Sequence, residues 1–150
     1  LLQGFSYIFN TPKKSKYPPI CDLNLIGSAD VIIKGVAGDI NFRPLLVNHG
    51  DINALGFKIG KLAYIPDVLE IPSKSWKELE DLDILVIDAL RRDPHPSHTH
   101  LEKTLLWLRK LSPKRAILTN LHNDLDYSEL KKELPEDVEP AFDGLEININ

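Results

Sequence analysis

The 150-residue sequence lacks several features on which whole classes of protein depend. It contains one cysteine, Cys21, which cannot close a disulfide within the chain. Its uncharged apolar runs, such as residues 84–87, are far shorter than the roughly 20 residues that span a bilayer. The sequence does not open with the charged and apolar regions of a secretory leader. We therefore expect a cytoplasmic protein that does not engage a membrane.

Basic tracts and methionine are also missing. The 18 Lys and Arg residues against 22 Asp and Glu residues give a net charge of -4, and no basic run is longer than Lys13-Lys14. Nothing in this pattern builds the positive surface that binding to nucleic acid requires, so we expect no nucleic-acid partner. Because methionine is absent altogether, we expect Leu1 to lie inside a longer protein that is processed or trimmed.

The residues that are present suit a folded domain. Apolar residues make up 43% of the chain and charged residues 27%, which is typical of globular proteins and not of disordered ones. A length of 150 residues predicts a single domain. No internal repeat or low-complexity segment interrupts it.

The first half of the chain has the pattern of an irregular segment followed by short strands. Pro12, Pro18 and Pro19 break regular structure, so residues 1–30 are predicted to be extended and irregular. Runs rich in β-branched residues, separated by short Gly, Asn and Asp turns, predict adjacent antiparallel strands. These runs are residues 31–33, 44–47, 54–59 and 62–65.

After Asp67 the pattern alternates between helix and strand. Ser75 with Glu78, and Thr99 with Glu102, have the spacing of capping boxes that open helices. Four leucines at helical spacing, residues 101, 105, 108 and 111, predict an apolar stripe that faces a sheet. The other predicted elements are strands at 83–87, 115–119 and 145–149 and a helix at 127–134. The fold class is α/β with a mixed sheet.

Polar side chains follow four of the predicted strands. They are Asn48-His49, Asp67, Asp88, and Asn120 with His122. The carboxyl ends of strands are where ligands bind in α/β sheets, and imidazole and carboxylate together suit Zn, Mn or Fe. Taken one at a time, each residue is equally explained as a turn former, a helix cap or a solvated side chain. The recurrence over several strands is what favours a metal site.

A loop between a strand and a helix start concentrates three histidines, His95, His98 and His100. Helix-start N–H groups attract anions, so a histidine here could act as a general acid or base beside a phosphate. His98 is the best candidate because it lies next to the predicted cap, Thr99. His95 and His100 are expected to be solvated or to support the site. A polar surface loop without function is the alternative interpretation.

Several runs, taken in order, resemble the metallo-β-lactamase superfamily, and in particular its phosphodiesterase branch similar to phosphoribosyl 1,2-cyclic phosphate phosphodiesterase. The likeness extends over essentially the whole chain. It is carried by residues 48–51, 55–60, 63–68, 83–91, 95–98, 116–119 and 141–144.

The resemblance implies an αββα sandwich, of which residues 1–150 form a single partial domain at the C-terminal end. It also implies two divalent metals, Zn or Mn, and hydrolysis of a small cyclic phosphodiester. By position, His49 matches the histidine that completes the first metal site, and Asp67 matches the carboxylate that bridges both metals. His98 matches a loop histidine that protonates the leaving oxygen or stabilises the phosphoryl charge.

The sequence departs from the family pattern in two ways. No histidine precedes His49, so the family's His-x-His-x-Asp-His segment is missing from these residues. Asn120 stands where the final ligand histidine is expected, with His122 as a substitute ligand two residues on. The alternative function is therefore a truncated, inactive remnant held by protein–protein contacts. The expected partners are a small phosphate-ester substrate and either further copies of this chain or the missing half.

Overall fold

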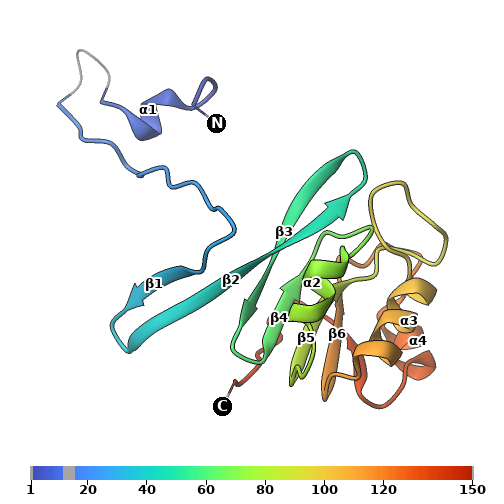
Figure 1. Cartoon of the computed structure of the whole chain (residues 1–150). Coiled ribbons are helices and arrows are strands. Elements are labelled where there is room, and N and C mark those ends of the chain that lie inside the picture. The colour runs from blue at the N-terminus through green and yellow to red at the C-terminus, as the bar shows by residue number, and fades with distance from the viewer. Residues whose placement is uncertain (1, 12–15, 150) are drawn as a thin grey trace.

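The computed structural model describes residues 2–11 and 16–149, in which seven strands form one sheet whose spatial order follows the chain order. Helices α2, α3 and α4 lie along one face of that sheet (Figure 1). The strands are β1 (Val31–Gly35), β2 (Gly38–His49), β3 (Ile52–Ile59), β4 (Leu62–Ile65), β5 (Ile84–Asp88), β6 (Arg115–Thr119) and β7 (Val138–Pro140). The helices are α1 (Ser6–Phe9), α2 (Ser73–Glu78), α3 (Leu101–Leu111) and α4 (Tyr127–Glu133).

The sheet is mixed, as the sequence predicts. Strands β1 to β4 pair antiparallel through short turns, and β4 to β7 pair parallel, with a helix in each connection. Two successive antiparallel pairings make β2 run in the same direction as β4, β5 and β6. The carboxyl ends of these four strands therefore meet at one edge of the sheet.

The main core lies between the sheet and the helices. Leu85 and Ile87 of β5 and Leu118 of β6 are fully buried there, and they pack with Leu101 and Leu108 of α3. Leu105 and Leu111 are partly buried against the same cluster, so the predicted leucine stripe faces the sheet. Among residues 2–11 and 16–149, no helix combines the length and apolar composition that crossing a membrane requires.

The opposite face of the sheet is apolar and has no helical cover. Strand register places Phe57 against Tyr64, Tyr64 against Val86, and Val86 against Ile117, so these side chains share one face. They line a shallow groove of about 400 Å³, and among residues 2–11 and 16–149 the segment around residues 141–147 is the one that packs onto it. We call this surface the open face.

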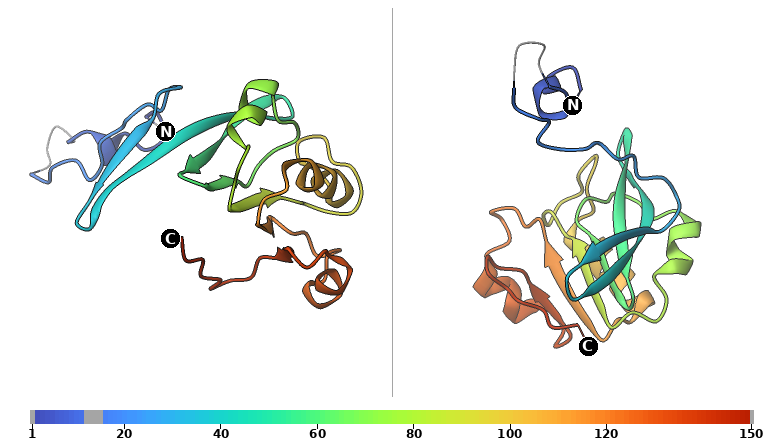
Figure 2. Two further views of the ribbon diagram at one scale, coloured as in Figure 1. Left: turned by 60° about the horizontal axis from the view of Figure 1, so that its bottom comes forward. Right: turned by 90° about the vertical axis from the view of Figure 1, so that its left-hand side faces the viewer.

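The N-terminal part of the chain stands away from the helices. β1 and the first half of β2 form a hairpin that projects from the body, and the described residues before it lie beyond the hairpin (Figures 1 and 2). Residues 16–30 form no helix or strand, as predicted, whereas residues 6–9 form the single turn α1. The predicted break at Pro12 lies outside the described residues.

Both predicted capping boxes are wrong. α2 begins two residues before Ser75, whose hydroxyl instead donates to the carbonyl of Leu46 at 2.6 Å and ties the helix to β2. α3 begins after His100, and the fully buried Thr99 hydroxyl lies 3.2 Å from that of Thr104. Other contacts therefore engage both hydroxyls: Ser75 bonds to the distant Leu46, and Thr99 accepts from Thr104 one turn into α3.

The predicted last strand is also misplaced. Residues 145–149 pair with no strand, because Leu145 and Ile147 pack onto the open face instead. The edge position beside β6 is taken by β7, which was not predicted. The predicted helix at 127–134 is confirmed as α4, with Asp126 accepting from the backbone N–H groups of Ser128 and Glu129.

Two leucines of α3 give a matched test of the packing. Leu108 is 5% exposed and Leu106 is 53% exposed. We expect Leu108→Ala to lower the free energy of unfolding by about 2–5 kcal/mol, because it leaves a cavity under the sheet. Leu106→Ala is expected to change it by less than about 0.5 kcal/mol. Urea denaturation measures both, and equal effects would contradict the packing described.

Candidate metal centre

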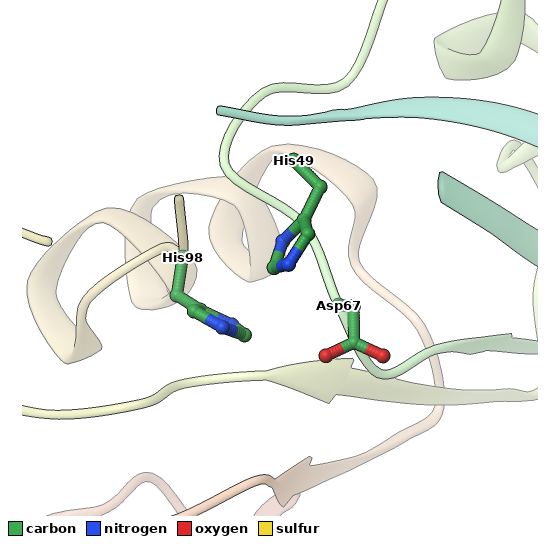
Figure 3. A group of neighbouring side chains, drawn as sticks. All are labelled: His49, Asp67 and His98. Carbon is green, nitrogen blue, oxygen red and sulfur yellow. The ribbon is translucent and has the colours of Figure 1, made fainter. Parts of the chain in front are cut away.

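Three side chains from different parts of the chain converge at the carboxyl edge of the sheet. His49 ends β2, Asp67 follows β4 by two residues, and His98 lies in the loop before α3. One ligand atom from each lies within 4.8 Å of the others. Figure 3 shows both rings and the carboxylate turned toward a common space. The structure thus brings together three residues that the sequence singled out.

Backbone hydrogen bonds hold the loops at this edge. The N–H of Asn48 donates to Glu70 at 2.9 Å, and its carbonyl accepts from Leu69 at 2.7 Å. This bridge fastens the segment after Asp67 to the end of β2. The N–H of Thr99 donates to the carbonyl of Val68 at 2.6 Å, which fastens the histidine loop to the same segment.

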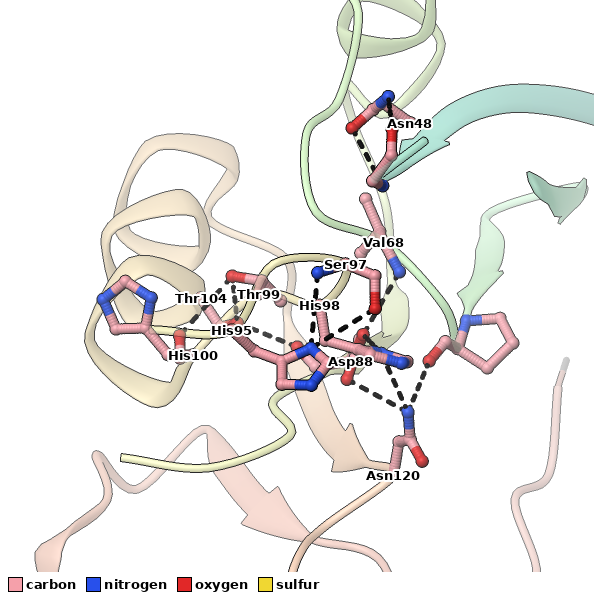
Figure 4. A network of polar contacts seen from close by, with 12 residues as sticks. Asn48, Val68, Asp88, His95, Ser97, His98, Thr99, His100, Thr104 and Asn120 are labelled. Atoms are coloured by element: carbon pink, nitrogen blue, oxygen red, sulfur yellow. Dashed lines mark hydrogen bonds and ion pairs between the residues drawn. The ribbon is translucent and has the colours of Figure 1, made fainter. Parts of the chain in front are cut away.

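Asp88, the last residue of β5, connects these pieces. Its side chain is fully buried, and its Oδ2 accepts from the Val68 N–H at 3.1 Å. The same oxygen lies 2.7 Å from Nδ1 of His98 (Figure 4). A carboxylate bound in this way holds the proton on Nδ1 and leaves Nε2 as the nitrogen that His98 offers to the site.

The surroundings of Asp88 act on its carboxyl in opposite directions. Burial raises the pKa of Asp88 above its ordinary value, because a low-dielectric interior disfavours the charged form. The hydrogen bonds from His98 and from the Val68 N–H lower it. Burial is the larger effect, and the hydrogen bonds from these partners offset part of it.

Gly50 allows the histidine loop to approach His49. It has a φ of +73°, and a Cβ at this position would lie 3.0 Å from the Pro96 carbonyl oxygen and 3.0 Å from Cβ of Ser97. The rings of His49 and His98 are consequently close, with centroids 4.5 Å apart in an edge-to-face arrangement. A side chain at residue 50 would separate them.

The residues present fit a divalent metal. Two imidazoles and one carboxylate are a usual set of protein ligands for catalytic zinc, which keeps its fourth position open. Nδ1 of His49 is buried and has no hydrogen-bond partner among the described residues. Buried polar atoms are normally paired, so this nitrogen is an atom that a bound metal would satisfy.

The two remaining sequence candidates differ in their positions. Asn120, with a φ of +62°, lies at the same edge, with its Nδ2 3.2 Å from Nδ1 of His98 and 3.4 Å from Oδ1 of Asp88. His122 is not brought into the group: its side chain is 55% exposed, and its Nδ1 lies 3.1 Å from Asp124.

The role of Asp88 was not predicted from the sequence. Asp88 stood out only as one of several polar residues after strands. The available signal was that it closes a strand whose five residues are all buried, where an unpaired carboxylate would be costly. The ring of His95 lies 5.2 Å from that of His98, which agrees with the supporting position, one of the two alternatives expected from the sequence.

Comparison with known families identifies the fold. The model of a family described as the beta-lactamase superfamily domain matches residues 2–120. The chain belongs to the beta-lactamase superfamily. The predicted resemblance to this superfamily is therefore confirmed, as is its mixed sheet flanked by helices.

Solved and curated relatives of this superfamily chain are longer. The crystal structure of a diphosphatase from the PhnP family matches with a TM-score of 0.84 and 30% identity, over 100% of this chain and 54% of that one. The short form of human tRNase Z matches with a TM-score of 0.58 and 17% identity, over 74% of this chain and 44% of that one, which is a likeness of fold. An octanoyltransferase of Porphyromonas gingivalis (strain ATCC BAA-308 / W83) is 31% identical over 114 residues, or 75% of this chain and 23% of that protein.

Two glycine substitutions test how the histidine loop is held. Gly50→Ala and Gly60→Ala both place a side chain at positive φ, which costs about 1–2 kcal/mol, but only residue 50 faces a tightly packed loop. We expect Gly50→Ala to weaken Zn²⁺ binding roughly tenfold or more, because its clash with the histidine loop shifts the neighbouring ligand His49. Gly60→Ala should bind Zn²⁺ as the unaltered chain does. Calorimetric titration with Zn²⁺ measures both, and equal affinities would contradict the contact.

Proposed function

We propose that this chain supplies part of the active site of a metal-dependent phosphodiesterase that acts on a small cyclic phosphate. The observation that carries the proposal is the convergence of His49, Asp67 and His98, with His98 oriented by a buried carboxylate. The likeness to a PhnP-family diphosphatase over the full length of the chain supports phosphate-ester chemistry.

In this proposal His49 and Asp67 hold the metal. Zn²⁺ or Mn²⁺ suits a mixture of imidazole and carboxylate, and the intact site takes two such ions. A bound metal supplies Lewis acidity toward a phosphoryl oxygen. Asn120 stands at the position of a ligand histidine, and its Nδ2 faces Asp88 and His98. Its neutral amide oxygen is a weaker metal donor than imidazole.

His98 is the proposed proton donor. Its Nδ1 is engaged by Asp88, so Nε2 is the atom that delivers a proton to the leaving oxygen or stabilises charge on the phosphoryl group. Asp88 acts as a positioning residue, because it fixes the ring orientation and the tautomer without reaching the substrate. The same ring lies close enough to His49 and Asp67 to serve as a third metal ligand. If His98 is a ligand, its substitution removes bound metal; if it is the proton donor, its substitution removes turnover alone.

Two variants separate ligation from proton transfer. Asp67→Ala is expected to lose both bound metal and turnover, because it removes a ligand. His98→Ala is expected to lower turnover of bis(p-nitrophenyl) phosphate by about 10²–10⁴-fold while most of the metal is retained. Elemental analysis and initial rates measure the two effects. Equal metal loss in both variants would contradict the role given to His98.

The alternative function is an inactive remnant held by protein contacts. Asn120 favours it, because this position lacks a ligand imidazole. Elemental analysis of the unaltered chain after supplementation with Zn²⁺ or Mn²⁺ distinguishes the two functions. A content below ~0.2 metal ion per chain would favour the remnant, because sites with too few protein ligands rarely retain metal.

We also propose that a second β-layer covers the open face. Stable domains bury both apolar faces of a sheet, and here helices bury only one. The matched PhnP-family chain is longer, since this chain spans 54% of it. We therefore propose that the layer on the open face is polypeptide equivalent to the rest of that relative, and not a second copy of this chain. It is either continuous with this chain or a separate chain.

Dye binding and sedimentation test this interface. The isolated chain is expected to bind the hydrophobic dye ANS and to self-associate weakly, because its open face meets water. Replacing Phe57 and Tyr64 by Ser should reduce dye binding, whereas the control Leu106→Ser on α3 should not. A monomer that binds no dye would contradict the interface. A tight dimer that binds no dye would identify a second copy as the occupant and contradict the partner proposed.

A further inference from the structure

His95 lies beside the proposed catalytic histidine but is held by different contacts. Its ring is half-buried, and its centroid is 5.2 Å from that of His98. Asp88 pairs with His98, whereas none of the carboxylates that the structure describes forms a hydrogen bond with His95. The role inferred below rests on the proposed function, because it concerns the substrate of the same site.

The hydrogen bonds of His95 determine its tautomer. The backbone N–H of Ser97 lies 3.3 Å from Nδ1 of His95, and the Ser97 hydroxyl lies at the same distance (Figure 4). A backbone N–H can only donate, so Nδ1 must be an acceptor without a proton. The neutral ring then carries its proton on Nε2. No described residue accepts a hydrogen bond from that atom.

The loop that carries His95 is held from both sides. Arg91 donates from Nε to the Asp93 carbonyl at 3.1 Å and from Nη2 to the Pro94 carbonyl at 2.6 Å. On the other side, Gly50 packs against the backbone of the loop. Burial, followed by the positive charge of Arg91, lowers the pKa of His95, which agrees with a neutral ring.

We propose that His95 is a substrate-binding residue that donates a hydrogen bond from Nε2 to a non-bridging oxygen of the substrate phosphate. A neutral donor in a fixed orientation strengthens binding of the phosphate and fixes its orientation, but it does not transfer a proton in the reaction. In this arrangement His98 acts on the leaving oxygen, and His95 holds the phosphoryl group in place.

Nitrogen NMR of the imidazole rings tests the tautomer in the Zn²⁺-loaded chain. His95 is expected to be neutral at pH 7 with its proton on Nε2. Ser97→Ala should leave this tautomer unchanged, because the backbone N–H remains. A proton on Nδ1, or a doubly protonated ring, would overturn the inference.

Titration with inorganic phosphate tests the contact. Phosphate should shift the Nε2 resonance of His95, and His95→Ala should weaken phosphate binding by roughly three- to tenfold, as loss of one neutral hydrogen bond does. His95→Gln, which keeps an N–H donor, should restore much of the affinity. The control His100→Ala, at the start of α3, should change nothing. Unaltered phosphate affinity in His95→Ala would overturn the inference.

Kinetics with bis(p-nitrophenyl) phosphate then distinguish this inference from the proposed function. His95→Ala should raise KM by a similar factor and leave kcat within about twofold, because a binding contact acts on both ground state and transition state. If the chain hydrolyses nothing while the NMR and phosphate results hold, the phosphodiesterase proposal fails and the phosphate contact stands. If hydrolysis proceeds with an unchanged KM in His95→Ala, the contact fails and the phosphodiesterase proposal stands.

Discussion

The buried carboxylate of Asp88 is the interaction on which the candidate site depends. It lies at the end of a fully buried strand and accepts hydrogen bonds from His98 and from the backbone beside Asp67. A buried charge without partners is strongly destabilising. The hydrogen bonds that shape the site therefore also stabilise the fold around Asp88. The hydrogen bond that pairs the buried Asp88 carboxyl with Nδ1 of His98 is the one that orients the His98 ring.

Strand direction explains why the site can form from distant residues. His49 belongs to the antiparallel part of the sheet and His98 follows the parallel part, yet β2 and β5 end at the same edge. The bridge from Asn48 to the segment after Asp67 and the close approach of the loop at Gly50 complete the arrangement. The open face lies on the other side of the sheet from the helices.

Much of this arrangement is readable from the sequence, because it follows from local patterns. Short runs of β-branched residues locate most of the strands, and the leucine spacing locates the buried face of α3. The polar residues after the strands identify His49 and Asp67 as candidates, and the histidine-rich loop before α3 identifies His98. Their convergence could be expected because strands that run in one direction end at one edge.

Most of the remaining features depend on contacts between residues far apart in the chain. The Ser75 hydroxyl donates to the carbonyl of Leu46 on β2 instead of capping α2, and no local pattern reveals that partner. The apolar run at 145–149 has the pattern of a strand, but its side chains pack onto the open face and its backbone pairs with no strand. The role of Asp88 rests on hydrogen bonds to residues 10 and 20 positions away.

We expect His49 and Asp67 to bind one divalent cation beside His98. Anomalous diffraction at the zinc absorption edge, from crystals of the chain grown with Zn²⁺, measures where the cation lies. We predict a single strong peak roughly 2.0–2.2 Å from a ring nitrogen of His49 and a carboxylate oxygen of Asp67. A peak at other residues, or an ordered site without zinc, would contradict this prediction.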